Sequence, residues 1–270
     1  MSATGYQIEW LLHRYNYDAE ARWTAPLEQW MNDHPRDICR IVDLGAGLAS
    51  NLRFWVSRIG TPQDWALVEI DQKLIREGGC WLDQLPAGIS ARYVQQDFME
   101  FLQEHPAPDL LLCNALLDVL TAHQITGLLD YLWIHRVPLL ASINYSGMEF
   151  YPALPEDQRF IGAYEAHMER EQPAGFALGR SLEPFLSTVR GPFEVVMHPS
   201  PWEIPAQDTL MLHFLLDYME KAVPEMLPQH DHPAFRDWLR VRREQVKERR
   251  LSARVLHIDA WIQRSEKKVD

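Results

Sequence analysis

The sequence predicts an α/β fold with a doubly wound, mostly parallel sheet and an added helical cap. Short, nearly continuous apolar segments alternate with helical patterns through the first half of the chain, which is typical of parallel strands buried on both faces. A glycine-rich turn follows the first of these segments. After residue 145 the pattern changes to a long stretch rich in Pro, Gly, Glu and aromatic residues. Because strand–helix–strand connections are right-handed, the alternating half should wind helices onto both faces of one sheet.

Seven segments have the apolar character of strands, and helical patterns lie between them. The expected strands are 40–44, 66–70, 91–95, 109–113, 137–144, 193–197 and 254–262. The expected helices are 8–34, 50–59, 72–85, 98–104, 122–133, 156–170, 181–189, 206–223 and 233–250. Together they predict a seven-stranded Rossmann-like sheet.

The order of these elements divides the chain into a helical start, a core and a cap. The N-terminal helical segment is 1–35, the ligand-binding core is 36–145, the cap is 146–192 and 200–252, and the final strands of the core are 193–199 and 253–264. We expect the cap to lie over the carboxyl edge of the sheet, where open α/β sheets bind ligands.

Composition indicates an ordinary globular protein, with 47% hydrophobic and 24% charged residues. No apolar run approaches the ~20 residues that cross a bilayer. Residues 1–10 lack a basic stretch followed by an apolar one, so we expect no secretory signal and a cytoplasmic location. The three cysteines form no CxxC pair, which gives no case for a metal site.

The charge is uneven along the chain. The net charge is −12, yet residues 232–270 carry 11 Lys and Arg against 6 Asp and Glu. A negative total argues against a general nucleic-acid binder. Because acids interleave the basic residues of 236–254, we expect a solvated helix face there.

The strongest chemical signal is the segment Ile-Val-Asp-Leu-Gly-Ala-Gly-Leu-Ala that ends at Ala49. Its strand ends near Asp43, and Gly45 and Gly47 form the turn before a helix. Glycines let the backbone turn tightly and approach a ligand closely, and the helix start offers free N–H groups. An acid before the first glycine would repel a phosphate and suits a cationic ligand end, such as the amino group of a methionine moiety.

Polar residues also follow the next three expected strands. Glu69 and Asp71 end the second strand, where a carboxylate can accept both hydroxyl hydrogens of a ribose. Asp97 and Phe98 follow the third strand, where an acid can accept from an adenine amino group and an aromatic ring can cover the base. Asn114 follows the fourth strand, where the strand order should reverse.

These four ordered motifs resemble those of the class I S-adenosylmethionine-dependent methyltransferases. The resemblance implies S-adenosylmethionine as cofactor, with Asp71 as the ribose acid and Glu69 as an alternative. It implies Asp43, Gly45, Gly47, Asp71 and Asp97 as cofactor-binding residues. Phe98 and Asn114 join them by their places after the strands, and Arg14 of the N-terminal helix could bind the carboxylate of the methionine end. Ala49 departs from the third glycine of the motif, a mild change because alanine still suits a helix start.

A second set of segments comprises Ala115-Leu-Leu-Asp118, Asn144-Tyr-Ser-Gly147, Pro199-Ser-Pro-Trp202 and His257-Ile-Asp259, with Arg14, Asp18 and Arg22 near the start. These segments resemble a bacterial group of small-molecule type within that superfamily, which implies no particular substrate. Candidates for substrate binding are Tyr145, His167, Trp202 and His257. His257 and Asp259 should share one face of the last strand, where the acid could orient the histidine and raise its pKa. The alternative for this pair is a structural role at the edge of the core.

The expected function is therefore methyl transfer to a small molecule under the helical cap. The sequence assigns no catalytic residue, because a methyl on sulfonium is already activated and the site mainly has to position the acceptor. Two alternatives stay open: a non-catalytic protein that binds S-adenosylmethionine, and an NAD-dependent oxidoreductase. We expect no membrane or metal and no nucleic-acid partner; the sequence leaves a homodimer open.

Overall fold

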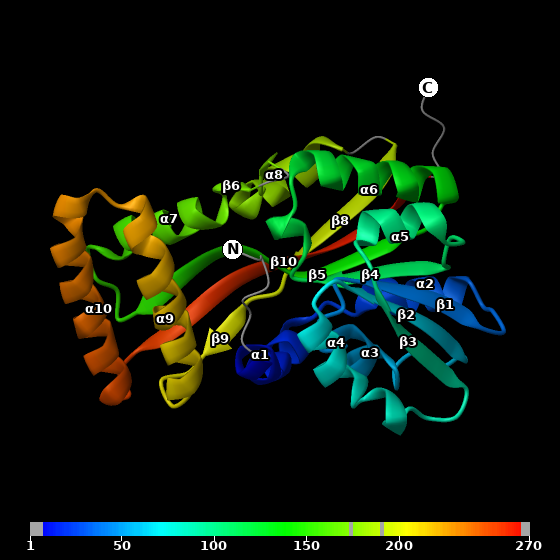
Figure 1. Ribbon diagram of the computed structural model, residues 1–270, viewed down its shortest axis with the longest axis horizontal. Helices are drawn as coiled ribbons and strands as arrows, with labels where there is room; N and C mark the ends of the chain where they lie inside the picture. Colours follow the sequence, from blue (N-terminus) through cyan, green and yellow to red (C-terminus); the bar gives the residue numbers. More distant parts are fainter. Residues whose placement is uncertain (1–7, 173–174, 190–191, 266–270) are drawn as a thin grey trace.

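An eight-stranded sheet forms the centre of the molecule in the computed structural model, which describes residues 8–172, 175–189 and 192–265. Seven strands run in the order β3-β2-β1-β4-β5-β10-β8, and β9 pairs with β10 (Figure 1). The strands are β1 (Cys39–Leu44), β2 (Gln63–Glu69), β3 (Ile89–Gln95), β4 (Leu110–Asn114), β5 (Leu139–Tyr151), β8 (Phe193–Pro199), β9 (Trp202–Ile204) and β10 (Ser252–Arg264). A separate hairpin joins β6 (Glu171–Gln172) and β7 (Gly175–Phe176).

Helices cover both faces of the sheet. They are α1 (Ile8–Ala21), α2 (Ala25–Asp33), α3 (Ser50–Trp55), α4 (Gln72–Gly79), α5 (Phe98–Glu104), α6 (Ala122–His135), α7 (Asp157–Met168), α8 (Leu182–Thr188), α9 (Thr209–Met226) and α10 (His232–Lys247). Short 3-10 turns are η1 (Leu82–Gln84), η2 (Leu117–Val119), η3 (Gly179–Ser181) and η4 (Gln229–Asp231).

Alternate residues of the buried strands pack into two separate cores. Ile41 of β1 and Leu112 of β4 pack with α2 and α3 on one face, whereas Val42 and Leu111 pack with α5, α6 and α8 on the other. The pairs β1–β2, β2–β3, β1–β4 and β4–β5 are parallel, and β10 is antiparallel to its neighbours. The predicted doubly wound, mostly parallel Rossmann-like sheet is thus confirmed.

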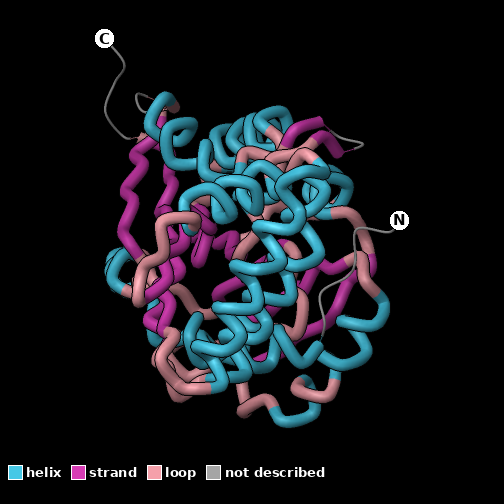
Figure 2. The backbone as a smooth tube through the Cα atoms, turned by 90° about the vertical axis from the view of Figure 1, so that its left-hand side faces the viewer, coloured by secondary structure: helices cyan, strands magenta, loops and turns pink. Residues whose placement is uncertain are grey.

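A third core lies beyond the main sheet, where β5 and β10, each 13 residues long, extend as an antiparallel ribbon. Helices α7, α9 and α10, which we call the helical lobe, pack around this ribbon (Figure 1). Figure 2 views the molecule from the lobe, whose helices stand in front of the strands. The lobe is built from residues inside the segments that the sequence assigned to a cap, and Trp10 of α1 joins its core.

A buried ion pair ties the lobe together. Arg242 of α10 is fully buried and donates to both carboxylate oxygens of Asp157 at the start of α7. The same arginine donates to the carbonyl of Pro152 at 2.8 Å, and the indole Nε1 of Trp238 donates to Asp157 at 2.8 Å. These contacts therefore join α10 to α7 and to the chain just after β5.

Three expectations about the elements need correction. Residues 8–34 form two helices rather than one, because Trp23 donates its backbone N–H to the side chain of Asp259 at 2.8 Å and Pro26 starts a new helix. The helix expected at 72–85 ends at Gly79 and is followed by η1. The seven expected strands are all present, and the sequence missed β9, which has only three residues.

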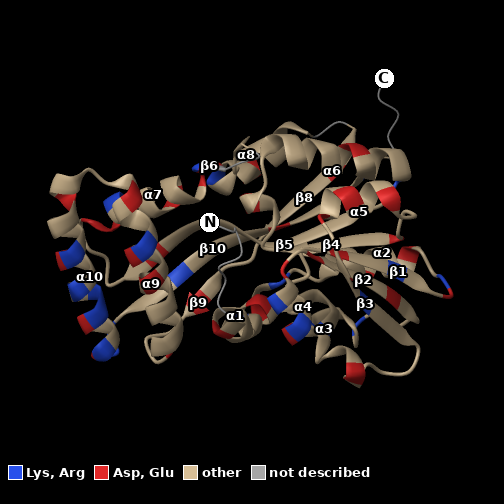
Figure 3. Ribbon diagram, in the orientation of Figure 1, with Lys and Arg blue, Asp and Glu red and all other residues tan. Residues whose placement is uncertain are grey.

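The basic segment of the chain lies on the outer side of α10 (Figure 3). Arg236, Arg240 and Lys247 are exposed there, as expected for a solvated face, whereas Arg242 points inward. Among the described residues, no helix combines the length and the apolar character that crossing a membrane requires. Residues 1–7, which carry most of the segment judged for a secretory signal, lie outside the described residues.

Candidate functional site

A cavity of about 350 Å³ opens at the carboxyl ends of β1, β2, β3 and β4. We call it the main cavity. Seven of the eight residues proposed from the resemblance line it, namely Arg14, Gly45, Gly47, Asp71, Asp97, Phe98 and Asn114. Residues that are far apart in the sequence thus meet at the edge where open α/β sheets bind ligands.

The glycine turn after β1 has the backbone that only glycine adopts readily. Gly45 has φ +64° and Gly47 has φ +53°, in the left-handed region. A Cβ on Gly45 would also lie 3.3 Å from Leu116 Cδ1. Ala49 also has a left-handed φ, of +59°. The expectation that alanine replaces the third glycine mildly, because it suits a helix start, is therefore wrong. A left-handed alanine costs roughly 1–2 kcal/mol.

Glu69 at the end of β2 fixes the shape of this turn. Its Oε2 accepts the backbone N–H of Gly47 at 2.9 Å, and its Oε1 accepts those of Ile70 and Asp71 at 2.8 and 2.9 Å. Asp71 lies beside it and accepts the N–H of Lys73 at 2.8 Å as the N-cap of α4. Both carboxylates border the main cavity, so the structure brings together the two alternatives for the ribose acid.

The end of β3 carries the second acidic position of the main cavity. Asp97 caps α5, and its Oδ1 accepts the backbone N–H groups of Met99 and Glu100 at 2.8 and 3.4 Å. Phe98 follows with its ring 9% exposed and bordering the cavity. An acid and an aromatic ring therefore lie together at the wall opposite α1.

Helix α1 closes the main cavity with an ion pair that the sequence analysis did not assign to the site. Asp18 is buried and accepts from Arg14 Nη2 at 3.1 Å and from Asn114 Nδ2 at 2.9 Å. All three side chains border the cavity. The sequence signals for this pair were the i,i+4 spacing of Arg14 and Asp18 on one helix and their place among the segments of the second resemblance. The Asn114 Oδ1 atom is buried and has no hydrogen-bond partner among the described residues.

Asp43 lies behind the glycine turn and not on the wall of the main cavity. It is 1% exposed, and its Oδ1 accepts from Asn51 Nδ2 at 2.7 Å. Asn51 in turn accepts from Arg22 Nη1 at 2.7 Å. The expected direct contact between this acid and a cationic ligand end is therefore not available. Burial raises the pKa of Asp43 to about 7, although the hydrogen bond from Asn51 and the charge of Arg22 oppose the rise.

Asp43→Asn should make the stability of the protein less dependent on pH. The pKa of Asp43 is raised in the folded state, so its contribution to stability is complete below about pH 4 and lost as the pH rises through 7. The free energy of unfolding of the variant minus that of the parent protein should therefore be larger at pH 8.5 than at pH 5, by on the order of 2–4 kcal/mol. Thermal unfolding of the parent protein, of Asp43→Asn and of the control Asp37→Asn, whose residue is exposed, measures this difference at both pH values. An equal dependence of stability on pH in these three proteins would contradict the prediction.

A second cavity of about 100 Å³ adjoins the first and shares Arg14, Ala115 and Val119 with it. We call it the inner cavity. Of the residues proposed for substrate binding, Tyr145, Trp202 and His257 line it. It is enclosed by α1, the ribbon of β5 and β10, and the helical lobe.

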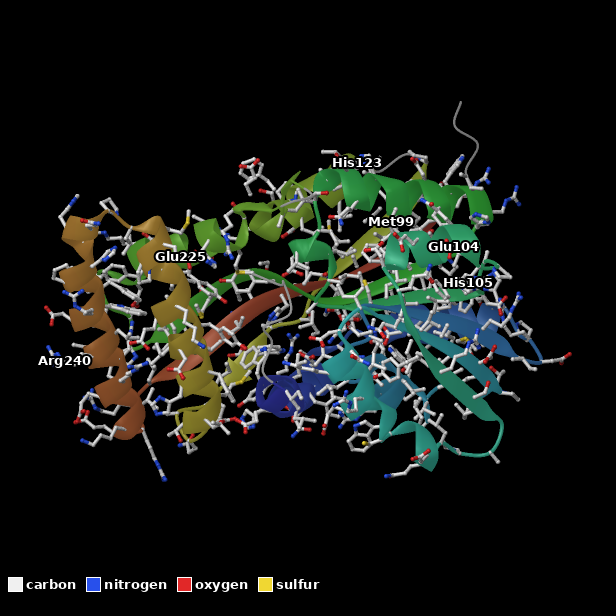
Figure 4. All side chains as sticks on the ribbon, in the orientation of Figure 1. Met99, Glu104, His105, His123, Glu225 and Arg240 are labelled. Carbon is white, nitrogen blue, oxygen red and sulfur yellow. The ribbon has the colours of Figure 1, made fainter. Side chains whose placement is uncertain are left out.

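His167 does not border either of these cavities. Its Nε2 lies 3.1 Å from Oε2 of Glu225 on α9, a residue at the upper end of the lobe (Figure 4). Burial and the neighbouring Arg170 lower its pKa. Its assignment as a substrate-binding residue is therefore corrected: α7 turns Tyr164 and Met168, and not His167, toward the inner cavity.

His257 and Asp259 do not form the expected pair, although β10 alternates regularly here and packs Ile258 and Ala260 into the core of the opposite face. Asp259 instead accepts from the backbone N–H of Trp23 and of Ile143 and from the hydroxyl of Ser200, at 2.8, 2.7 and 2.6 Å. It therefore joins β10 to the chain before α2, to β5 and to the loop after β8. The pKa of His257 is lowered well below its usual value by burial and by the charge of Arg14, so this ring is neutral.

Solved structures with similar folds include several methyltransferases. A putative type II methyltransferase from Anaeromyxobacter dehalogenans is 13% identical, over 90% of this chain and 97% of that one, with a TM-score of 0.53. A SAM-dependent methyltransferase from Thiobacillus denitrificans, in complex with S-adenosyl-L-homocysteine, is 18% identical over 89% and 90%, with a TM-score of 0.45. No family model matches the sequence, and no curated protein does. The first likeness shows that this chain has the Rossmann-like fold of a methyltransferase.

Proposed function

We propose that this protein binds S-adenosylmethionine in the main cavity and transfers its methyl group to a small molecule in the inner cavity. The observation that carries the proposal is the meeting of three features at one edge of the sheet. These are a left-handed glycine turn, carboxylates at the ends of β2 and β3, and the Arg14–Asp18–Asn114 group on the opposite wall. The fold also agrees with the resemblance of the sequence to the class I S-adenosylmethionine-dependent methyltransferases.

The residues of the main cavity fit the parts of this cofactor. A carboxylate accepts about four hydrogen bonds; Asp71 accepts one and Glu69 three within the protein, so together they can accept both ribose hydroxyls. Asp97 and Phe98 suit an adenine, through its amino group and its flat face. The unpartnered Asn114 Oδ1 and the carboxylate of Asp18 suit an ammonium group. The volume lies in the usual range for small-molecule sites, about 300–1,000 Å³.

The bound cofactor would supply a methyl group that its sulfonium has already activated. The protein then has to hold an acceptor in line with that group and to keep water out. The inner cavity is lined in part by aromatic side chains and shares three wall residues with the main cavity, which supports it as the place of the acceptor. The helical lobe would in this way act as the cap that the sequence suggested.

Thermal unfolding with S-adenosylhomocysteine, and separately with NAD, tests the cofactor assignment. At 100 times its Kd a ligand adds about 2.7 kcal/mol, which corresponds to roughly 5–10 °C for a chain of this size. We expect this shift with S-adenosylhomocysteine alone. A shift with NAD alone would support a dinucleotide-dependent oxidoreductase, and no shift with either would reject the assignment of the main cavity. Tight binding without turnover on any acceptor would indicate a non-catalytic binding protein.

A further inference from the structure

The inner cavity holds three buried polar atoms that have no hydrogen-bond partner among the described residues. They are Oδ1 of Asp118, Nε1 of Trp202 and Nδ1 of His257. Their side chains belong to residues that are 5%, 2% and 5% exposed. Leaving such atoms unpaired inside a protein is costly, at about 1–3 kcal/mol each and more for a charged group. Their gathering around one cavity indicates that a ligand completes their hydrogen bonds.

Asp118 gives this cavity a buried negative charge that forms no ion pair among the described residues. It lies in η2, after the fourth strand, and nearby backbone N–H groups and the charge of Arg14 lower its pKa, against the larger effect of burial. The cation in the same wall, Arg14, is already paired with Asp18 at 3.1 Å. Burial raises the pKa of Asp118 only to about 6, so it is a carboxylate at neutral pH. His257, across the cavity on β10, is neutral.

The remaining walls of the inner cavity are mostly aromatic. Trp10 and Trp202 meet edge to face with centroids 5.8 Å apart, and Trp10 meets Tyr218 at 5.3 Å. Tyr145 and Tyr164 contribute from β5 and α7. Arg14 already lies over the rings of Trp202 and Trp10, with its guanidinium carbon 4.8 and 5.9 Å from their centroids. The tyrosine rings and the carboxylate of Asp118 are therefore the groups that favour an ammonium ion, through cation–π attraction and ion pairing. A dry cavity of 150 Å³ holds benzene, so about 100 Å³ suits an amine of only a few heavy atoms.

On the basis of the proposed function, we propose that the methyl acceptor is a small aliphatic amine. Asp118 and the aromatic walls bind it as an ammonium ion, and Asp118 then removes its proton. The ammonium proton moves to the Asp118 carboxylate, which frees the lone pair on nitrogen. That lone pair forms the new N–C bond as the C–S bond breaks, with its electron pair remaining on sulfur. The proton leaves Asp118 for solvent when the methylated ammonium product departs.

Burial favours an amine over a hydroxyl compound in this cavity. Proton transfer from an ammonium to a carboxylate removes two charges from a low-dielectric site, which such a site favours. Transfer from a neutral hydroxyl would only move one negative charge from one oxygen to another and gains nothing from burial. The other titratable groups that border Asp118 are Arg14 of α1, Tyr145 of β5, Tyr164 of α7, Tyr218 of α9 and His257 of β10.

Calorimetric titration with three probes of one shape tests this proposal. Isobutylamine, isobutanol and isobutyrate are titrated at pH 7.5, each with and without saturating S-adenosylhomocysteine. We expect the amine to bind at least tenfold more tightly than either other probe. Asp118→Asn should remove that preference, and the exposed Asp217→Asn on α9 should keep it. Binding of the amine should also weaken as the pH falls below about 6, where Asp118 takes up a proton.

The outcomes separate this proposal from the one on which it rests. Equal binding of the three probes, or an amine preference that survives in Asp118→Asn, overturns the amine site. Absence of S-adenosylhomocysteine binding overturns the cofactor assignment, while an amine preference dependent on Asp118 would still support the site. Methylated isobutylamine after incubation with S-adenosylmethionine, formed by the Asp217→Asn protein and not by Asp118→Asn, supports both.

Discussion

Glu69→Gln should weaken S-adenosylhomocysteine binding by about 10- to 100-fold. The carboxylate accepts three backbone N–H groups, of which that of Gly47 belongs to the glycine turn. The amide of glutamine replaces one acceptor oxygen by a donor, so one of these N–H groups must lose its partner. A hydrogen bond to a charged group contributes about 1.5–3 kcal/mol, and the displaced turn would add its own loss of ligand contacts.

Asp71→Asn is the matched control, since both changes turn a carboxylate at the same strand end into an amide. Asparagine is as good an N-cap as aspartate, so α4 should keep its start, and only bonds to the ligand should be lost. We expect a smaller loss of affinity than in Glu69→Gln, measured by titration calorimetry at pH 7.5. A larger loss in Asp71→Asn would show that Asp71 alone accepts the ribose hydroxyls. Unchanged affinity in Asp71→Asn would remove it from the site.

Asp157→Asn should lower the stability of the protein by about 3–5 kcal/mol, because it leaves the buried Arg242 without its counter-charge. Arg242 is fully buried and Asp157 nearly so, which excludes the water that would otherwise solvate the guanidinium. The melting temperature should fall by roughly 10 °C, at ~2–4 °C per kcal/mol for a chain of this size. Circular dichroism at 222 nm on heating, at pH 7, measures it.

Asp217→Asn serves as the control for this change. It removes one of the two acidic partners of Arg243, which lies next to Arg242 on the same helix and also pairs with Glu220 at 2.7 Å. The Arg243 and Asp217 side chains are 38% and 50% exposed. An exposed pair contributes about 0–1 kcal/mol, so this variant should melt close to the parent protein. Similar melting temperatures for Asp157→Asn and Asp217→Asn would mean that the buried pair does not hold the lobe together.

Local patterns were sufficient to predict the sheet and the main cavity. The glycine turn, the acids after β2 and β3 and Asn114 each follow a strand directly, and parallel strands bring their carboxyl ends to one edge. The choice between Glu69 and Asp71 could not be made in the same way, because both are acids at one strand end. Only the backbone bonds of Glu69 distinguish them.

The inner cavity could not be predicted, because its geometry depends on packing between distant segments. Asp18 enters the site only through the path of α1 across the sheet edge. Alternation places His257 and Asp259 on one face of β10, but it does not reveal that the backbone N–H groups of Trp23 and Ile143 and the hydroxyl of Ser200 bind the Asp259 carboxylate. His167 is one helical position away from Met168, which borders the cavity; the rotation of α7 decides between them, and the sequence does not reveal it.

Segments near the two ends of the chain both border the inner cavity, and this constrains how the protein folds. Asp259 of the last strand binds the backbone of Trp23, 236 positions earlier, and Arg14 and His257 border one cavity. Contacts over such sequence separations form slowly, because the intervening chain must first be ordered. During synthesis, the glycine turn and its neighbouring strands can assemble early. A nascent chain that has not yet produced β10 would therefore have the strand ends that border the main cavity but would lack the inner cavity.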